Sequence, residues 1–220
     1  MIPVVWVHII FGTVAVLAGG MALVVRKGGP LHRKAGAVYF WSMLIMATAG
    51  AVLSLVKPQM ITLLAAAFTI YLVMTSRAAF RTRDHSQYGW AMIVALAVAV
   101  AGIGWGLEAQ YGGTGLKHGY AAENYFFFGV LGLISLGLDA NAFFRKSLTY
   151  KHRVARHLWR MCFSYFIAAG SLFTGPGATA FPEVVRASGI LDLPEPLILL
   201  FMLFWLARTL IVRRKKVVQA

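Results

Sequence analysis

Cysteine and acidic residues are scarce in this chain. The single cysteine, Cys162, excludes an intramolecular disulfide and a metal site built from several thiolates. Only 7 residues are Asp or Glu, against 21 Lys or Arg, and charged residues make up 13% of the chain. Apolar residues make up 60%, whereas a soluble domain has about 45–50%. The excess predicts a surface that faces lipid.

Long apolar runs with short connections account for nearly the whole sequence. A helix that crosses a hydrocarbon core of about 30 Å needs roughly 17–25 apolar residues. Seven runs meet or approach this length: Pro3–Val25, Ala37–Val56, Met60–Ala79, Trp90–Leu107, Tyr125–Phe144, Leu158–Thr174 and Leu197–Val212. The predicted fold is therefore all-α, a seven-helix transmembrane bundle that forms one integral membrane domain over residues 1–220.

The basic residues predict how these helices are oriented. When loops are assigned alternately to the two sides, every Lys and Arg except Lys57, Lys117 and Arg186 falls on one side. The positive-inside rule assigns that side to the cytosol, so we expect the N-terminus outside and the C-terminus inside. The basic excess then indicates topology and contact with anionic membrane lipids. It argues against nucleic acid as a partner.

Three short motifs carry a resemblance to a known family. They are His8-x3-Gly12, Lys27-Gly-Gly-x-x-His32-Arg-x-x-Gly36 and Arg156-His157-Leu-Trp-Arg160-Met161. In these motifs the chain resembles an uncharacterised family of bacterial multi-pass membrane proteins that has no assigned activity. The resemblance implies the seven-helix layout and a place in the bacterial cytoplasmic (inner) membrane. It implies no chemistry.

A weak internal repeat favours the same layout. Each of three basic loops carries a histidine that precedes an Ala-Gly pair by a similar interval: His32 before Gly50, His85 before Gly102, and His152 before Gly170. The pattern predicts three related helical hairpins followed by a single helix. It would bring the three histidines to a similar depth at the cytosolic face.

Asp139 is the one carboxylate predicted inside an apolar run. It lies about 8 Å from the end of the fifth run at 1.5 Å per residue, where a bare carboxylate would cost several kcal/mol. We therefore expect it to face other helices and to be paired. Ser135 precedes it by one turn on the same face, and His157 and Arg160 begin the next run, which a hairpin would place opposite.

This constellation allows a structural and a functional interpretation. In the first, an Asp139–Arg160 or Asp139–His157 pair only locks two helices together. In the second, the same residues form a cytosol-facing polar pocket that binds or transports a small anionic ligand, a lipid headgroup or a proton. Its predicted residues are Asp139, His157, Arg160, Arg77 and His32.

Two alternative functions remain open at this stage. A b-type haem could be held by His8 at the outer side or by His157 and Met161 at the inner side, because bundles ligate haem through histidines on facing helices. The chain could also serve as an accessory subunit of a membrane complex. His157, Met161 and Cys162 are donors suited to Cu(I), but one such run predicts no metal site.

An enzymatic role receives little support from the sequence. The zinc signature HExxH and the nucleophile motif Gly-x-Ser-x-Gly are both missing. Paired carboxylates for acid–base hydrolysis are missing from the apolar runs as well. The sequence therefore favours binding or transport over catalysis.

Overall fold

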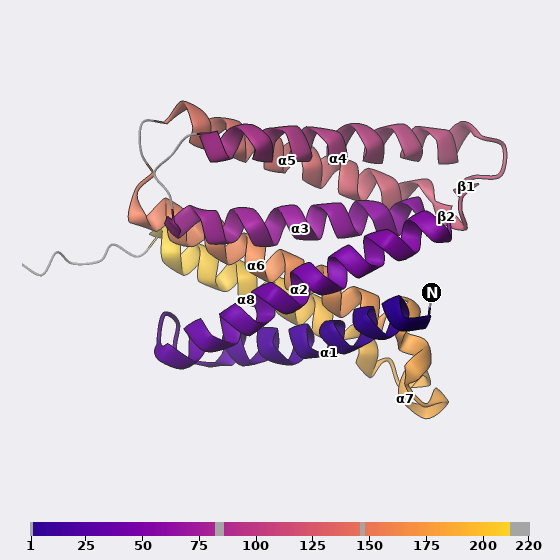
Figure 1. Cartoon of the computed structure of the whole chain (residues 1–220), viewed down its shortest axis with the longest axis horizontal. Coiled ribbons are helices and arrows are strands. Elements are labelled where there is room, and N and C mark those ends of the chain that lie inside the picture. The colour runs from indigo at the N-terminus through magenta and orange to yellow at the C-terminus, as the bar shows by residue number, and fades with distance from the viewer. Residues whose placement is uncertain (1, 82–85, 146–147, 212–220) are drawn as a thin grey trace, which may run out of the picture. The chain divides into compact units, whose positions relative to one another are not determined.

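The computed structural model describes residues 2–81, 86–145 and 148–211, and most of these residues are helical (Figure 1). This confirms the all-α prediction. The elements in chain order are α1 (Ile2–Val24), α2 (Pro30–Val56), α3 (Met60–Arg81), α4 (Ser86–Tyr111), β1 (Leu116–Lys117), β2 (Tyr120–Ala121), α5 (Ala122–Phe144), α6 (Tyr150–Phe173), the 3-10 helix η1 (Pro176–Ala180), α7 (Glu183–Ala187), the 3-10 helix η2 (Ile190–Asp192) and α8 (Pro194–Ile211). The short strands form one antiparallel pair.

Among the described residues, six helices are long and apolar enough to cross a membrane: Ile2–Val24, Pro30–Val56, Met60–Phe80, Tyr88–Tyr111, Ala122–Phe144 and Ile190–Ile211. The chain is thus a multi-pass helical membrane protein. The remaining predicted run, Leu158–Thr174, falls in α6. That helix begins eight residues earlier, at Tyr150, and its first turns carry Lys151, Arg153 and Arg156. These cations lower its hydropathy, so α6 is not one of the six.

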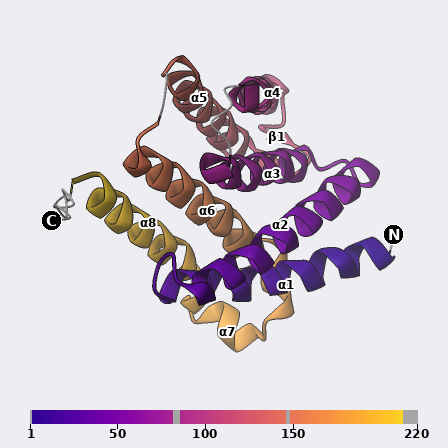
Figure 2. The same ribbon diagram turned by 60° about the vertical axis from the view of Figure 1, so that its left-hand side comes forward.

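Contacts between helices divide the chain into two compact units, Met1–Ser147 and Leu148–Ala220. In the first unit, α1 packs on α2, α2 on α3, α3 on α4, and α4 on α5 (Figure 2). In the second unit, α6 packs on α8 and on η1. The single domain expected from the sequence remains a prediction.

A stripe of small residues joins α1 to α2. Ala15 and Gly19 are buried on α1, and a Cβ added at Gly12 would lie 3.4 Å from Sδ of Met46 on α2. These small residues therefore face the neighbouring helix, as small residues commonly do between membrane helices. The turn that connects the two helices passes through Gly28, whose φ of 75° favours glycine.

Helices α4 and α5 meet backbone to backbone. A Cβ added at Gly102 would lie 2.5 Å from the backbone nitrogen of Gly129, and one added at Gly132 would lie 2.6 Å from that of Ala99. Neither space can hold a side chain. Of the glycines near the end of α4, Gly102 is therefore packed closely against α5. Gly104 faces open space.

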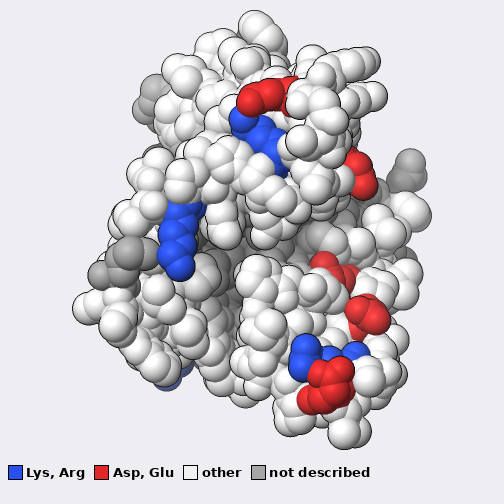
Figure 3. All heavy atoms as spheres, turned by 90° about the vertical axis from the view of Figure 1, so that its right-hand side faces the viewer, with Lys and Arg blue, Asp and Glu red and all other residues white. Residues whose placement is uncertain are grey.

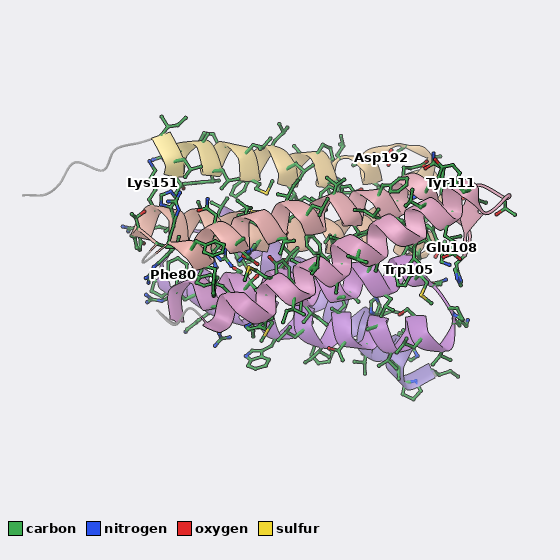
Figure 4. All side chains as sticks on the ribbon, turned by 90° about the horizontal axis from the view of Figure 1, so that it is seen from above. Phe80, Trp105, Glu108, Tyr111, Lys151 and Asp192 are labelled. Carbon is green, nitrogen blue, oxygen red and sulfur yellow. The ribbon has the colours of Figure 1, made fainter. Side chains whose placement is uncertain are left out.

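The first unit has a basic end and an opposite end. The basic end comprises the α1–α2 turn with Arg26, Lys27, Arg33 and Lys34, together with the last turns of α3. At the opposite end, Glu108 of α4 forms an ion pair with Lys117. Figure 4 shows Trp105, Glu108 and Tyr111 near one end of α4 and Phe80 far from them, on α3.

In the second unit, polar contacts fix both ends of α6. Thr149 caps its first turn by accepting a hydrogen bond from the His152 backbone N–H. At the other end, the Thr174 hydroxyl donates to Oε2 of Glu195 at 2.6 Å, next to the start of α8. Figure 3 shows the side of the molecule that lies at the right in Figure 1, where β1 and β2 are; the few acidic and basic side chains visible there form small separate groups on a mostly uncharged surface.

Candidate functional site

Asp139 is fully buried on α5 and accepts a hydrogen bond from a tyrosine. The Tyr71 hydroxyl on α3 donates to Oδ2 of Asp139 at 2.5 Å, and both side chains are at most 1% exposed. The prediction that Asp139 faces other helices and is paired is confirmed, although Tyr71 was not among its expected partners.

Other buried hydroxyl groups lie within two helical turns of Tyr71 on α3 and of Asp139 on α5. Ser135, one turn before Asp139, is fully buried, and its Oγ has no hydrogen-bond partner among the described residues. On α3, the Thr75 hydroxyl donates to the Tyr71 carbonyl at 2.6 Å, and Ser76 is fully buried. The Tyr71 ring stacks on Phe68, with centroids 5.6 Å apart and planes 15° apart. The stacked ring and the helix contacts hold the Tyr71 hydroxyl in place.

Tyr71, Thr75 and Ser76 were not predicted from the sequence. The one pattern that points to them is a set of four hydroxyl residues within an apolar run: Thr69, Tyr71, Thr75 and Ser76. All four are buried in α3. Buried hydroxyl groups in a membrane helix need partners within the protein. The spacing alone could not show that the partner of Tyr71 lies 68 residues further along the chain.

The second unit holds two of the other residues predicted for the pocket, His157 and Arg160. On α6, Arg160 is fully buried and its guanidinium carbon lies 5.1 Å from the Trp159 ring centroid. Arg156 is buried too, whereas His157 and Met161 are half-buried. Burial of Arg160 at the start of the apolar part of α6 agrees with a role inside the protein. Its pairing with Asp139 remains a prediction.

Arg77 and His32 lie at the basic end of the first unit. The Arg77 guanidinium stacks on Phe40, 4.4 Å from the ring centroid, and lies 5.9 Å from that of Trp41. His32 uses Nδ1 to donate to the Ala22 carbonyl at 3.1 Å, across the α1–α2 turn. Neither contact involves Asp139. His85, the second histidine of the proposed repeat, lies outside the described residues, and the hairpin repeat remains a prediction.

His8 is held between α1 and α2. Its Nδ1 donates to the Met46 carbonyl at 2.9 Å, and a Cβ added at Gly50 would lie 3.2 Å from the imidazole ring. Because a carbonyl oxygen can only accept, Nδ1 carries the hydrogen of this bond. Within the described ranges, no three His, Cys, Asp or Glu side chains are grouped so that they could hold a metal ion.

Comparison with known proteins relates just under half of the chain to a family. Residues 5–108 match the family described as predicted membrane protein (DUF2306). This stretch of the chain is similar to that family. The match confirms the resemblance to an uncharacterised family of multi-pass membrane proteins. No curated protein and no solved structure matches the chain. The DUF2306 stretch contains His8, Tyr71 and Arg77, whereas Asp139 lies beyond it.

Proposed function

We propose that this protein binds and releases a proton at Asp139 within the membrane, with the Tyr71 hydroxyl as hydrogen-bond partner. The supporting observation is the 2.5 Å bond between these two buried side chains. They lie on α3 and α5, two helices suited to cross a membrane. An ionisable residue at membrane depth costs several kcal/mol, and it therefore marks a candidate functional site by default.

The neighbouring hydroxyl groups suit proton transfer. A tyrosine hydroxyl both donates and accepts, and so does a serine hydroxyl. Ser135 Oγ, one turn from the carboxylate and without a described partner, offers a second position for a proton or a bound water. An anionic ligand would instead need His157 and Arg160 beside Asp139, and that arrangement has only the sequence pattern as support.

The proposed setting is the bacterial cytoplasmic membrane, with seven spans, the N-terminus outside and the C-terminus in the cytosol. The one-sided distribution of Lys and Arg supports this topology. Helix α6 would supply the seventh span: its 24 residues reach about 36 Å at 1.5 Å per residue. Its first, cationic turns would then lie at the cytosolic boundary, where long basic side chains reach the headgroups.

Infrared difference spectroscopy between low and high pH tests the proton site in purified protein. The wild type should show the C=O stretching band of a buried, protonated carboxyl group, and Asp139→Asn should lack it. Asparagine keeps the size and an acceptor oxygen, so the variant should stay folded. Tyr71→Phe should shift the band because the carboxyl group loses its hydrogen bond.

Glu123→Gln is the matched control, because Glu123 is an exposed carboxylate in the first turn of the same helix. This variant should keep the buried band unchanged. A band that persists in Asp139→Asn would rule out Asp139 as the proton-binding group. In liposomes loaded with a pH-sensitive dye, the wild type should also change the rate at which a pH gradient decays, and Asp139→Asn should not.

A b-type haem is the second candidate, and one contact favours it. Histidines that ligate a metal usually donate their other ring nitrogen to a carbonyl or carboxylate, as His8 does to Met46. The predicted result is a Soret band in purified protein that shifts on addition of dithionite and is lost in His8→Ala. Protein purified from haem-supplemented cells without any Soret band would exclude this candidate.

A further inference from the structure

An open groove runs along the face of α2 next to Val7 of α1. Its volume is about 370 Å³. It is lined by Val7 and by five residues of α2: Trp41, Leu44, Ile45, Thr48 and Ala49. All are apolar except Thr48. From Trp41 to Ala49 the lining extends about 12 Å along the helix at 1.5 Å per residue. Its shape and chemistry suit an extended hydrocarbon chain.

The Arg77 side chain lies beside Trp41, at one end of this groove. The Arg77 guanidinium lies 4.4 Å from the Phe40 ring and 5.9 Å from the Trp41 ring, within the range of cation–π contact. It forms no ion pair and no hydrogen bond with any other described residue, and it is only half-buried. Stacking on aromatic faces leaves the N–H groups at the edge of the guanidinium available to an anion.

The level of Arg77 in the membrane fits a lipid headgroup. It lies three residues before Phe80, where the apolar segment of α3 ends, or about 4.5 Å along the helix. Lys34 is exposed on α2 and precedes Trp41 by seven residues, two helical turns, so both lie on one face. The groove thus has its cations at the end where lipid phosphates lie, and its apolar length points toward the bilayer interior.

We propose that this groove binds one anionic glycerophospholipid, with its phosphate on Arg77, an acyl chain along Trp41 to Ala49, and Lys34 close to the headgroup. A free phosphate ion would leave the apolar lining unused. A helix from another protein would have to supply both an apolar face for the groove and an anion beside Arg77. An anionic lipid carries its acyl chain and its phosphate at these two levels already.

Native mass spectrometry of protein in detergent, titrated with phosphatidylglycerol or phosphatidylcholine, tests the site. The wild type should bind phosphatidylglycerol more tightly than phosphatidylcholine. Arg77→Gln should weaken binding of phosphatidylglycerol about tenfold, because a charge-assisted hydrogen bond to phosphate is lost. Phosphatidylcholine should lose less, because its own choline cation already offsets the charge of its phosphate. Arg77→Lys, which keeps the charge and loses the planar fork, should fall between the wild type and Arg77→Gln.

A second variant tests the groove itself. Thr48→Trp fills it from an exposed position and should weaken the binding of both lipids. Two controls place comparable changes away from the groove: Arg33→Gln removes an exposed charge at the basic end, and Leu17→Phe enlarges an exposed side chain on α1. Both should bind like the wild type. Circular dichroism and elution volume establish that each variant is folded.

Four results would overturn the proposal. Equal losses in Arg77→Gln and Arg33→Gln would mean that the lipid is attracted by overall charge and not by Arg77. Unchanged binding in Thr48→Trp would remove the groove from the site. Displacement of the lipid by inorganic phosphate at similar concentration, or a dimer mass in place of a lipid adduct, would identify a free anion or a second copy of the chain as the occupant.

Discussion

Gly132→Val is expected to part α4 from α5 and to prevent stable folding. The Cβ of the new side chain would lie 2.6 Å from the Ala99 backbone nitrogen and 2.9 Å from the Ala95 carbonyl oxygen. Both are backbone atoms within a helix, so no rotamer change can relieve the overlap and one helix must move away. The expected loss in unfolding free energy is about 3 kcal/mol or more, a large part of a typical total of about 5–15 kcal/mol.

The matched control is Gly137→Val, on the same helix, where an added Cβ meets nothing within 4 Å. It makes the same chemical change and should cost little. Elution profiles of detergent-solubilised protein after heating, and SDS titrations of the folded fraction, would measure both variants. If Gly132→Val elutes and unfolds like Gly137→Val, then the close contact of α4 and α5 is wrong.

Tyr71→Phe is expected to destabilise the protein by about 2 kcal/mol, because it removes one hydrogen bond to a buried carboxylate. The phenylalanine ring keeps the stacking on Phe68, so the change isolates the hydroxyl. The cost should nearly vanish when Asp139 is already alanine, which gives a coupling energy of about 1–2 kcal/mol in a double-mutant cycle. Where Asp139→Ala does not fold, Asp139→Asn keeps an acceptor and should lower the cost to about 1 kcal/mol.

Tyr125→Phe provides the control pair for this cycle. Its hydroxyl donates to the Lys117 carbonyl at 2.8 Å, and it lies 14 residues from Asp139 on α5, about 21 Å along the helix. Its effect should add to that of Asp139→Ala, because distant sites with no shared partner are independent. Additive effects of Tyr71→Phe and Asp139→Ala would contradict the bond between these two residues.

The helices themselves could be predicted from the sequence with good accuracy. The runs Pro3–Val25 and Tyr125–Phe144 differ from α1 and α5 by at most three residues at either end, because apolar length alone determines such boundaries. The predicted boundaries are wrong where a helix continues beyond its apolar part, and α2 begins at Pro30 and not at Ala37. Helix α6 starts at Tyr150 and not at Leu158, because Thr149 caps a first turn that is cationic. A search for apolar runs leaves such a turn out of the helix.

The candidate site was only half predictable. Asp139 stood out because a carboxylate in an apolar run is costly and therefore rare, and its burial follows from the same argument. Tyr71 did not stand out, because an aromatic residue fits an apolar helix whether or not its hydroxyl is used. Which of the eight tyrosines meets Asp139 depends on how α3 and α5 are packed, and hydrophobic periodicity carries no information about that. The stacking of Arg77 on Phe40 was hidden for the same reason.

The glycine contact between α4 and α5 also limits how Asp139 can move. With no side chains between their backbones at Gly102 and Gly132, these two helices have no room to slide or tilt against each other. They should move as one rigid body. Any movement that separates Asp139 from Tyr71 must therefore displace α4 together with α5. The backbone must then bend on the α3 side of the pair.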